Sequence, residues 1–319
     1  MTEPVLVTGA AGFAGSHLVD ALVADGATVV GWHRPGNPPG AQLSVRWVPV
    51  DILDREGVAR ALTAAAPSVI FHCAGSAHVG SSWQDSLTPL ETNVLGTHHL
   101  LDGMRRAGLR SRVVVTGSAL VYQSSTAALS EDAPLAPSSP YGLSKLAQEM
   151  TALGAAARDG LPVVVARPFN HAGPRQDPSY ATAGFARKIA LAEAGRAPCG
   201  IAVGNLDASR DLTDVRDTVR AYRALAERGA PGRVYNVCRG QAYSVRELLG
   251  GLIALARVPL DVRPDPALFR PNDNPIVLGD PSRITRETGW RAAIPIERTL
   301  GDLLEYWRQR VALGDECAS

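Results

Sequence analysis

Three glycines at a spacing of three, directly after a short apolar run at residues 5–8, constrain the fold of this chain most. Gly9, Gly12 and Gly15 precede an amphipathic helical pattern, and Phe13 lies among them. The first glycine permits a tight turn, the second lets the backbone approach a pyrophosphate, and the third lets the helix pack on the strand. The N–H groups and dipole of the helix start favour anionic phosphates. The stretch therefore predicts a dinucleotide site.

Strand and helix patterns alternate through the first half of the chain. Apolar, β-branched runs occupy residues 27–32, 45–50, 68–73, 112–116 and 162–166, and helical patterns occupy 16–24, 54–66, 89–107 and the stretch from 141. This alternation predicts an α/β fold, a Rossmann-type doubly wound parallel sheet. After residue 170 the rhythm breaks into shorter elements. We predict a dinucleotide-binding domain at 1–170, a smaller, partly interleaved C-terminal α/β substrate lobe at 171–312, and a frayed tail at 313–319.

Charge and composition exclude several classes of protein. The chain of 319 residues has 32 basic and 31 acidic side chains, so no global field favours nucleic acid or an anionic membrane. No apolar run reaches the roughly 18 residues of a membrane helix, and the N-terminus lacks a basic, signal-like region. The four cysteines show no metal-ligand spacing. We expect a cytoplasmic protein with free thiols and no metal.

The end of the second predicted strand bears on the choice of cofactor. An acidic residue there would bind the ribose 2′-OH of NAD, whereas an arginine accommodates a 2′-phosphate. This chain has Arg34 and no carboxylate at that point, which favours NADP(H) and leaves NAD(H) possible. Asp51, just beyond the third predicted strand and followed by Ile52, is placed to accept a hydrogen bond from the adenine amino group.

Tyr141 and Lys145 form the strongest catalytic constellation, with Ser118 just past the fifth predicted strand. Residues at i and i+4 share one face of a helix. A neighbouring ammonium would stabilise the tyrosine phenolate and lower its pKa from about 10. The serine can hydrogen-bond the same substrate oxygen. Such a set suits proton transfer at a carbonyl or alcohol oxygen while hydride moves at carbon.

Five motifs together resemble those of the extended short-chain dehydrogenase/reductases: the glycine triplet, residues 72–75, 93–97 and 118–122, and residues 141–145. The resemblance implies Tyr141 as acid–base, Lys145 on the nicotinamide ribose and Ser118 as carbonyl partner. It places Ala74 and Asn93 near the cofactor, the latter ordering a water or backbone. It further implies a nucleotide-sugar substrate in the C-terminal lobe and a homodimer formed through the helices near 89–107 and 141–158.

Motifs in the second half narrow the resemblance to the GDP-mannose branch of that family. They lie at residues 167–174, 203–206, 210–217, 234–238 and 269–271. The resemblance implies that the following residues bind the substrate: Ser76, Asn170, Lys188, Val203, Arg210 and Arg270. Asn170 would contact the sugar or phosphate, Lys188 and Val203 the base, and the two arginines the diphosphate, which suits a planar guanidinium.

One departure separates the activities of this branch. The dehydratases need a carboxylate acid–base pair directly after the Ser/Thr, and this chain has Ala119 and Leu120 there, which cannot move protons. We therefore expect NADPH-dependent reduction of the C4 keto group of a nucleotide-linked 4-keto-6-deoxyhexose, with GDP-4-keto-6-deoxy-D-mannose going to GDP-D-rhamnose. Two alternatives stay open: a nucleotide-sugar 4-epimerase with tightly bound NAD, and a non-catalytic NADP(H)-binding sensor. Gln123, in place of the usual glycine, leaves the exact sugar open.

Overall fold

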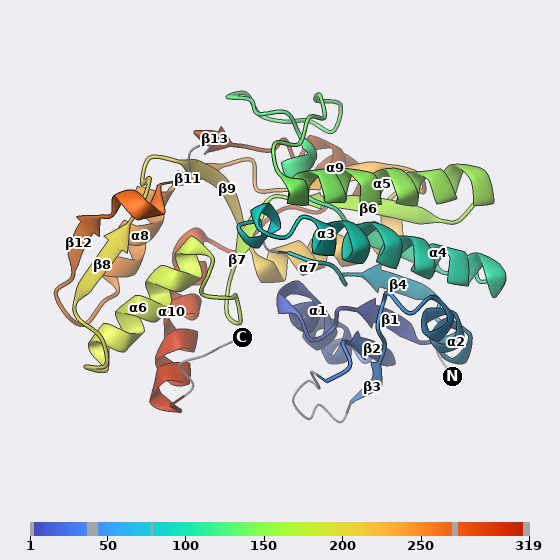
Figure 1. The fold of residues 1–319 in the computed structure, drawn as a ribbon, viewed down its shortest axis with the longest axis horizontal. Coiled ribbons are helices and arrows are strands. Elements are labelled where there is room, and N and C mark those ends of the chain that lie inside the picture. Colours follow the sequence, from blue (N-terminus) through green and yellow to red (C-terminus); the bar gives the residue numbers. More distant parts are fainter. Residues whose placement is uncertain (1–2, 37–43, 78, 270–273, 315–319) are drawn as a thin grey trace.

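A seven-stranded parallel sheet forms the centre of the larger part of the molecule. The computed structural model describes residues 3–36, 44–77, 79–269 and 274–314. The strand order β10-β6-β5-β4-β1-β2-β3 is that of a Rossmann-type sheet, which confirms the predicted fold class (Figure 1). Its strands are β1 (Val5–Thr8), β2 (Val29–His33), β3 (Val45–Pro49), β4 (Val69–His72), β5 (Arg112–Thr116), β6 (Val163–Pro168) and β10 (Val234–Val237).

Helices cover both faces of this sheet. One face packs against α1 (Phe13–Ala24), α7 (Val215–Arg228) and α9 (Ser282–Thr288), and the other against α2 (Arg55–Ala65), α4 (Gly96–Arg106) and α5 (Pro140–Asp159). The central strands are buried on both faces, which explains their nearly continuous Val/Ile/Leu sequence. The sheet is thus a rigid support for the residues that follow its strands at the carboxyl edge.

The chain returns to this sheet after it has left it. Strand β10 pairs with β6 in parallel, and α7 packs on α1, although both elements come after residue 170. The domain division at residue 170 stays a prediction. Strand β10 and helix α7 follow that residue in the sequence and still pack in the larger part of the molecule.

A second lobe stands beside the sheet, on the left of Figure 1. Its hydrophobic core lies among α6 (Ala181–Glu193), α8 (Val245–Ala254) and α10 (Ile296–Ala312). The strand pair β8 (Gly200–Val203) and β12 (Asp261–Pro264) belongs to it. A small sheet of β7 (Asn170–Ala172), β9 (Ser209–Asp214), β11 (Ala242–Ser244) and β13 (Ile276–Val277) connects the two parts.

The helix predicted over 89–107 is interrupted. A single α-turn, α3 (Leu87–Pro89), leads into a π-helix at Leu90–Leu95, and only then does α4 begin at Gly96. π-helical turns inside helices often occur at functional sites. Here the turn holds Asn93, whose side chain is fully buried.

None of the helices in the described part of the chain combines the length and the apolar character needed to cross a membrane.

Candidate active site

The glycine loop after β1 has no room for side chains, so its bare backbone can approach a dinucleotide closely. Gly9 has φ +64°, a left-handed conformation that favours glycine, and a methyl group on it would meet the Ala74 amide nitrogen at 2.7 Å. A methyl group on Gly15 would overlap the Gly9 carbonyl oxygen. The loop lies between β1 and β4, where the strand order reverses and ligands bind in open α/β sheets. These residues therefore fit the pyrophosphate of the predicted cofactor.

Other predicted cofactor residues lie on α1 and after strands β2 and β3. Phe13 stacks on His171 with 5.6 Å between the ring centroids. Arg34 is exposed just after β2, where a 2′-phosphate would lie. Asp51 is exposed, and its Oδ1 accepts a hydrogen bond from the Leu53 amide at 2.9 Å. Ile52 packs against Gly96, since a methyl group added to that glycine would lie 2.9 Å from the isoleucine side chain.

Ser118, Tyr141 and Lys145 come together at the carboxyl edge of the sheet. Ser118 follows β5 and caps a 3₁₀ turn, its Oγ accepting from the Leu120 amide at 3.1 Å. The Ser139 hydroxyl accepts from the Gly142 amide at 3.1 Å and starts α5 one residue before a proline at the first helical position. Tyr141 is the second residue of the helix, and its phenol faces Ser118. The Lys145 Nζ lies 5.9 Å from the centroid of the tyrosine ring.

The predicted effect of Lys145 on Tyr141 is wrong for the protein on its own. Burial raises the pKa of Tyr141, the Tyr180 phenol adds to this, and the Ser118 hydrogen bond only opposes it. The Lys145 ammonium donates to the Thr116 carbonyl at 3.0 Å and to Gln148 Oε1 at 2.9 Å. Burial lowers the pKa of Lys145 to about 8. The phenol therefore stays protonated at neutral pH, as a proton donor to a substrate oxygen requires.

Asn93 fixes the loop after β4 rather than facing solvent. Its Oδ1 accepts from the Ser76 amide at 2.9 Å, and its Nδ2 donates to the Ser144 Oγ at 2.9 Å. Gly75 makes room for this contact, because a methyl group there would lie 2.6 Å from the Asn93 Oδ1. The side chain thus joins the β4 loop, where Ser76 is half-buried, to the helix that carries Tyr141.

The residues predicted in the second lobe are more scattered. Asn170 on β7 is exposed, and Arg210 lies on the adjacent β9, where its Nη1 donates to the Ser209 and Asn274 carbonyls at 2.9 and 2.8 Å. Val203 is buried at the end of β8, and Lys188 is exposed on α6. Arg270 lies outside the described residues. The structure therefore brings Asn170 and Arg210 onto one small sheet.

Three buried polar residues were not assigned a role from the sequence. Gln148, Thr97 and His72 connect behind the catalytic lysine through hydrogen bonds of 2.9 Å each. One signal was available, since Gln148 follows Lys145 at i+3 and must share its helical face. No group of three or more His, Cys, Asp or Glu in the described ranges could hold a metal ion.

A dinucleotide loop, a Tyr–Lys pair and a serine at one sheet edge define a nicotinamide-dependent oxidoreductase of the extended short-chain type. The family model described as GDP-mannose 4,6 dehydratase matches residues 6–303, and the chain belongs to this family.

Individual relatives are similar over nearly their whole length. GDP-6-deoxy-D-mannose reductase of Pseudomonas aeruginosa is 36% identical over 98% of this chain and 99% of its own. RMD from Pseudomonas aeruginosa, solved in complex with NADPH, has a TM-score of 0.85 at 34% identity and covers 97% of this chain and 100% of its own. UDP-glucose 4-epimerase from Thermotoga maritima, solved with UDP-glucose, has a TM-score of 0.87 at 26% identity, covering 97% and 99%.

Proposed function

We propose that this protein reduces the C4 keto group of a nucleotide-linked 4-keto-6-deoxyhexose with NADPH, and that its substrate is GDP-4-keto-6-deoxy-D-mannose, which becomes GDP-D-rhamnose. Similarity to a GDP-6-deoxy-D-mannose reductase and to a structure solved with NADPH supports both the reaction and the cofactor. Arg34, exposed after β2, supports the phosphorylated cofactor.

Each residue of the site has a separate role in such a reduction. NADPH, when bound by the glycine loop and Arg34, supplies the hydride. Ser118 donates a hydrogen bond to the C4 oxygen and polarises the carbonyl, and Tyr141 gives its proton to the same oxygen as negative charge develops there. The Lys145 ammonium holds the nicotinamide ribose. Asn170 and Arg210 orient the sugar and its diphosphate.

We favour a reductase over a dehydratase because the residues directly after Ser118 have no side chain that can donate or accept a proton. The 3₁₀ turn that follows it consists of Ala119, Leu120 and Val121. Elimination of water across C5 and C6 needs an acid and a base next to the sugar ring. Reduction at C4 needs only Ser118 and Tyr141 from this part of the chain.

An assay with defined sugars tests the proposal. GDP- and dTDP-4-keto-6-deoxyhexoses are offered with NADPH, the loss of nicotinamide absorbance is followed, and the product stereochemistry at C4 is determined. We expect stoichiometric oxidation of NADPH with the GDP sugar and formation of GDP-D-rhamnose. Activity with the dTDP sugar instead would overturn the substrate, and copurified NAD with no net NADPH consumption would show an epimerase. Binding of NADPH with no turnover of any sugar would show a sensor.

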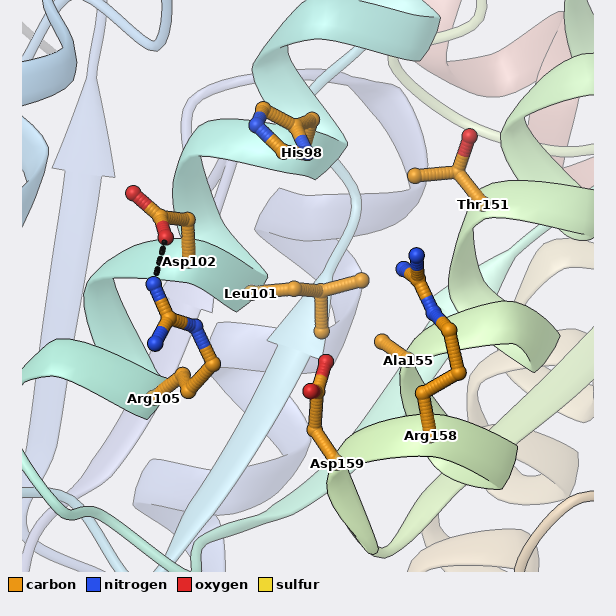
Figure 2. Close-up of a pocket in the computed structure, with 8 residues that line it drawn as sticks. All are labelled: His98, Leu101, Asp102, Arg105, Thr151, Ala155, Arg158 and Asp159. Atoms are coloured by element: carbon orange, nitrogen blue, oxygen red, sulfur yellow. Dashed lines mark hydrogen bonds and ion pairs between the residues drawn. The ribbon is translucent and has the colours of Figure 1, made fainter.

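We also propose that two copies pair through the face formed by α4, α5 and the preceding π-helix. Leu95, Leu143 and Met150 on this face are 48%, 52% and 66% exposed. Beside them, a cavity of about 250 Å³ separates Arg105 on α4 from Arg158 on α5 (Figure 2). An apolar strip flanked by charges of both signs suits a self-complementary contact between identical subunits.

Light scattering after size exclusion tests this pairing. Met150→Glu is expected to give monomers, because it places a charge in the apolar strip. Leu255→Glu is the matched control, since Leu255 is 44% exposed but lies at the end of α8 in the second lobe. A parent protein that is monomeric, or a Met150→Glu variant that stays dimeric, would contradict the proposed interface.

A further inference from the structure

The chain contains two lysines, Lys145 and Lys188, and the first is held from two sides. Its side chain is 5% exposed, and its Nζ donates to the Thr116 carbonyl and to Gln148 Oε1. An ammonium has three N–H donors and no acceptor, so the amide oxygen of Gln148 must be the atom that faces it. Two donors are thereby fixed, and the third remains for the ligand side of the site.

Gln148 is itself oriented from behind. Its Nε2 donates to the Thr97 Oγ1 at 2.9 Å, and that hydroxyl donates its single hydrogen to the Asn93 carbonyl at 2.6 Å. The hydroxyl can therefore only accept from His72, whose Nε2 lies 2.9 Å away. This fixes His72 as the neutral Nε2–H tautomer, with Nδ1 as an acceptor.

The chain of hydrogen bonds continues to the glycine loop. His72 Nδ1 accepts from the Thr8 Oγ1 at 2.8 Å, and that oxygen in turn accepts from the Ala74 amide at 3.1 Å. Thr8 directly precedes Gly9, the turn residue of the predicted pyrophosphate site. All four side chains between the loop and the lysine are fully buried.

We propose that Gln148 is the positioning residue of the Lys145 ammonium, and that Thr97 and the Nε2–H form of His72 lock it in place, so that the glycine loop and the lysine share one framework. The inference rests on the proposed function, in which Lys145 acts on the cofactor ribose. A glutamine suits this position because it accepts from the lysine and donates to the threonine at the same time.

Few charged groups other than residue 148 lie close enough to Lys145 to change its pKa. His72 and Cys73 face it from the end of β4, and Tyr141 faces it from its own helix. Burial keeps the pKa of His72 low, at about 3, and raises the pKa of the Cys73 thiol to about 12, so both are neutral around pH 7. A charge placed at position 148 should therefore dominate the titration of the lysine.

Carbon-13 NMR of protein labelled at the lysine Cε tests the proposal without substrate or cofactor. With two lysines the spectrum has two signals, and exposed Lys188 serves as internal reference. We expect Gln148→Glu to raise the pKa of Lys145 by about one unit or more, because a carboxylate favours the ammonium. Gln148→Met, which has no donor and only a weakly accepting sulfur, is expected to lower it.

Kinetics provide the second readout. Gln148→Met and Thr97→Val are expected to lower kcat about 10- to 100-fold, with KM for the sugar within about twofold, because the lysine loses its orientation. Gln148→Glu should shift the alkaline limb of the kcat profile to higher pH. Ser111→Ala is the matched control, since it also removes a buried hydroxyl hydrogen bond, to the Pro67 carbonyl at 2.5 Å, but at the base of β5.

Unchanged titration of Lys145 in both Gln148 variants would overturn the proposal, as would equal losses of kcat in Thr97→Val and Ser111→Ala. If Gln148→Met does not fold, Gln148→Glu and Thr97→Val decide the matter. An inactive parent whose lysine titration nevertheless shifts as expected would refute the proposed function and leave the positioning role intact.

Discussion

The two sides of the candidate site are built in different ways. On the sheet side, Tyr141, Lys145 and Asn93 are buried. Lys145 donates a hydrogen bond to the Thr116 carbonyl at the end of β5, and Asn93 donates one to Ser144 on the helix that carries Tyr141 and Lys145. On the side of the second lobe, Asn170 and Lys188 are exposed. Under the proposed function, the fold would fix the proton-transfer geometry in advance, and exposed side chains would recognise the nucleotide and sugar.

The sharpest test of the buried side removes one oxygen. Tyr141→Phe is expected to lower kcat about 10³-fold, because it deletes the proton donor, with protein stability little changed. Steady-state rates at saturating NADPH measure this. Tyr235→Phe is the matched control, since that buried phenol bonds Glu287 and the Ala230 amide instead of Ser118. Comparable rates in the two variants would remove the tyrosine from the mechanism.

A second test compares ion pairs of the two regions. Arg167 and Glu149 form a bidentate pair beneath the site, at 2.8 and 2.5 Å, and each side chain is 3% exposed. Glu149→Gln should lower the free energy of unfolding by about 3–5 kcal/mol, because it leaves a buried guanidinium without its counter-charge.

The exposed pair of Arg246 and Asp207 in the second lobe provides the comparison. Asp207→Asn should not measurably change the free energy of unfolding, because water screens such pairs. Urea unfolding curves measure both variants, and equal effects would contradict the contrast between the two regions.

Acid sensitivity tests the junction between the regions. His17 on α1 contacts the Pro174 carbonyl and Arg175, both at 2.8 Å, and burial, reinforced by that arginine, lowers its pKa from 6.5 to about 4. The unfolded chain binds the proton first, so stability falls from about pH 6.5 to pH 4 by about 1.4 kcal/mol per pH unit for this group. His17→Gln should flatten that slope in urea unfolding measured between these pH values. An unaltered slope would show that the lowered pKa of His17 does not cause the acid sensitivity.

The smallest effect is expected at the exposed cofactor contact. Arg34→Ala should raise KM for NADPH about three- to tenfold and leave KM for NADH unchanged, because only the former carries a 2′-phosphate. Arg46→Ala, which changes an exposed arginine on β3, is the matched control. Parallel changes for both cofactors would exclude Arg34 as the phosphate contact.

The sequence predicted the strands of the sheet better than it predicted the hydrogen-bond partners of the site residues. Six strands were visible as apolar runs, but β10, with buried Asn236 in its centre, joins the sheet only through long-range pairing with β6. The spacing of Tyr141 and Lys145 predicted their shared face. It could not show that Gln148 and the Thr116 carbonyl hold the ammonium, because the latter is a backbone group on another element.

The π-helix was equally hidden. A change in hydrogen-bond register over Leu90–Leu95 leaves the apolar pattern of the segment nearly unaltered, and this segment carries the buried Asn93. In the second lobe, single arginines gave little guidance, because the same residue type also forms exposed ion pairs there, as Arg246 does.

Transfer of deuterium tests the central claim most directly. The protein is incubated with GDP-4-keto-6-deoxy-D-mannose and NADPH that carries deuterium at the transferable C4 position, and the sugar product is examined by NMR. The account predicts GDP-D-rhamnose with one deuterium at C4 and an equivalent of NADP⁺. A sugar without deuterium at C4, or an epimerised sugar formed while the added NADPH remains, would contradict it.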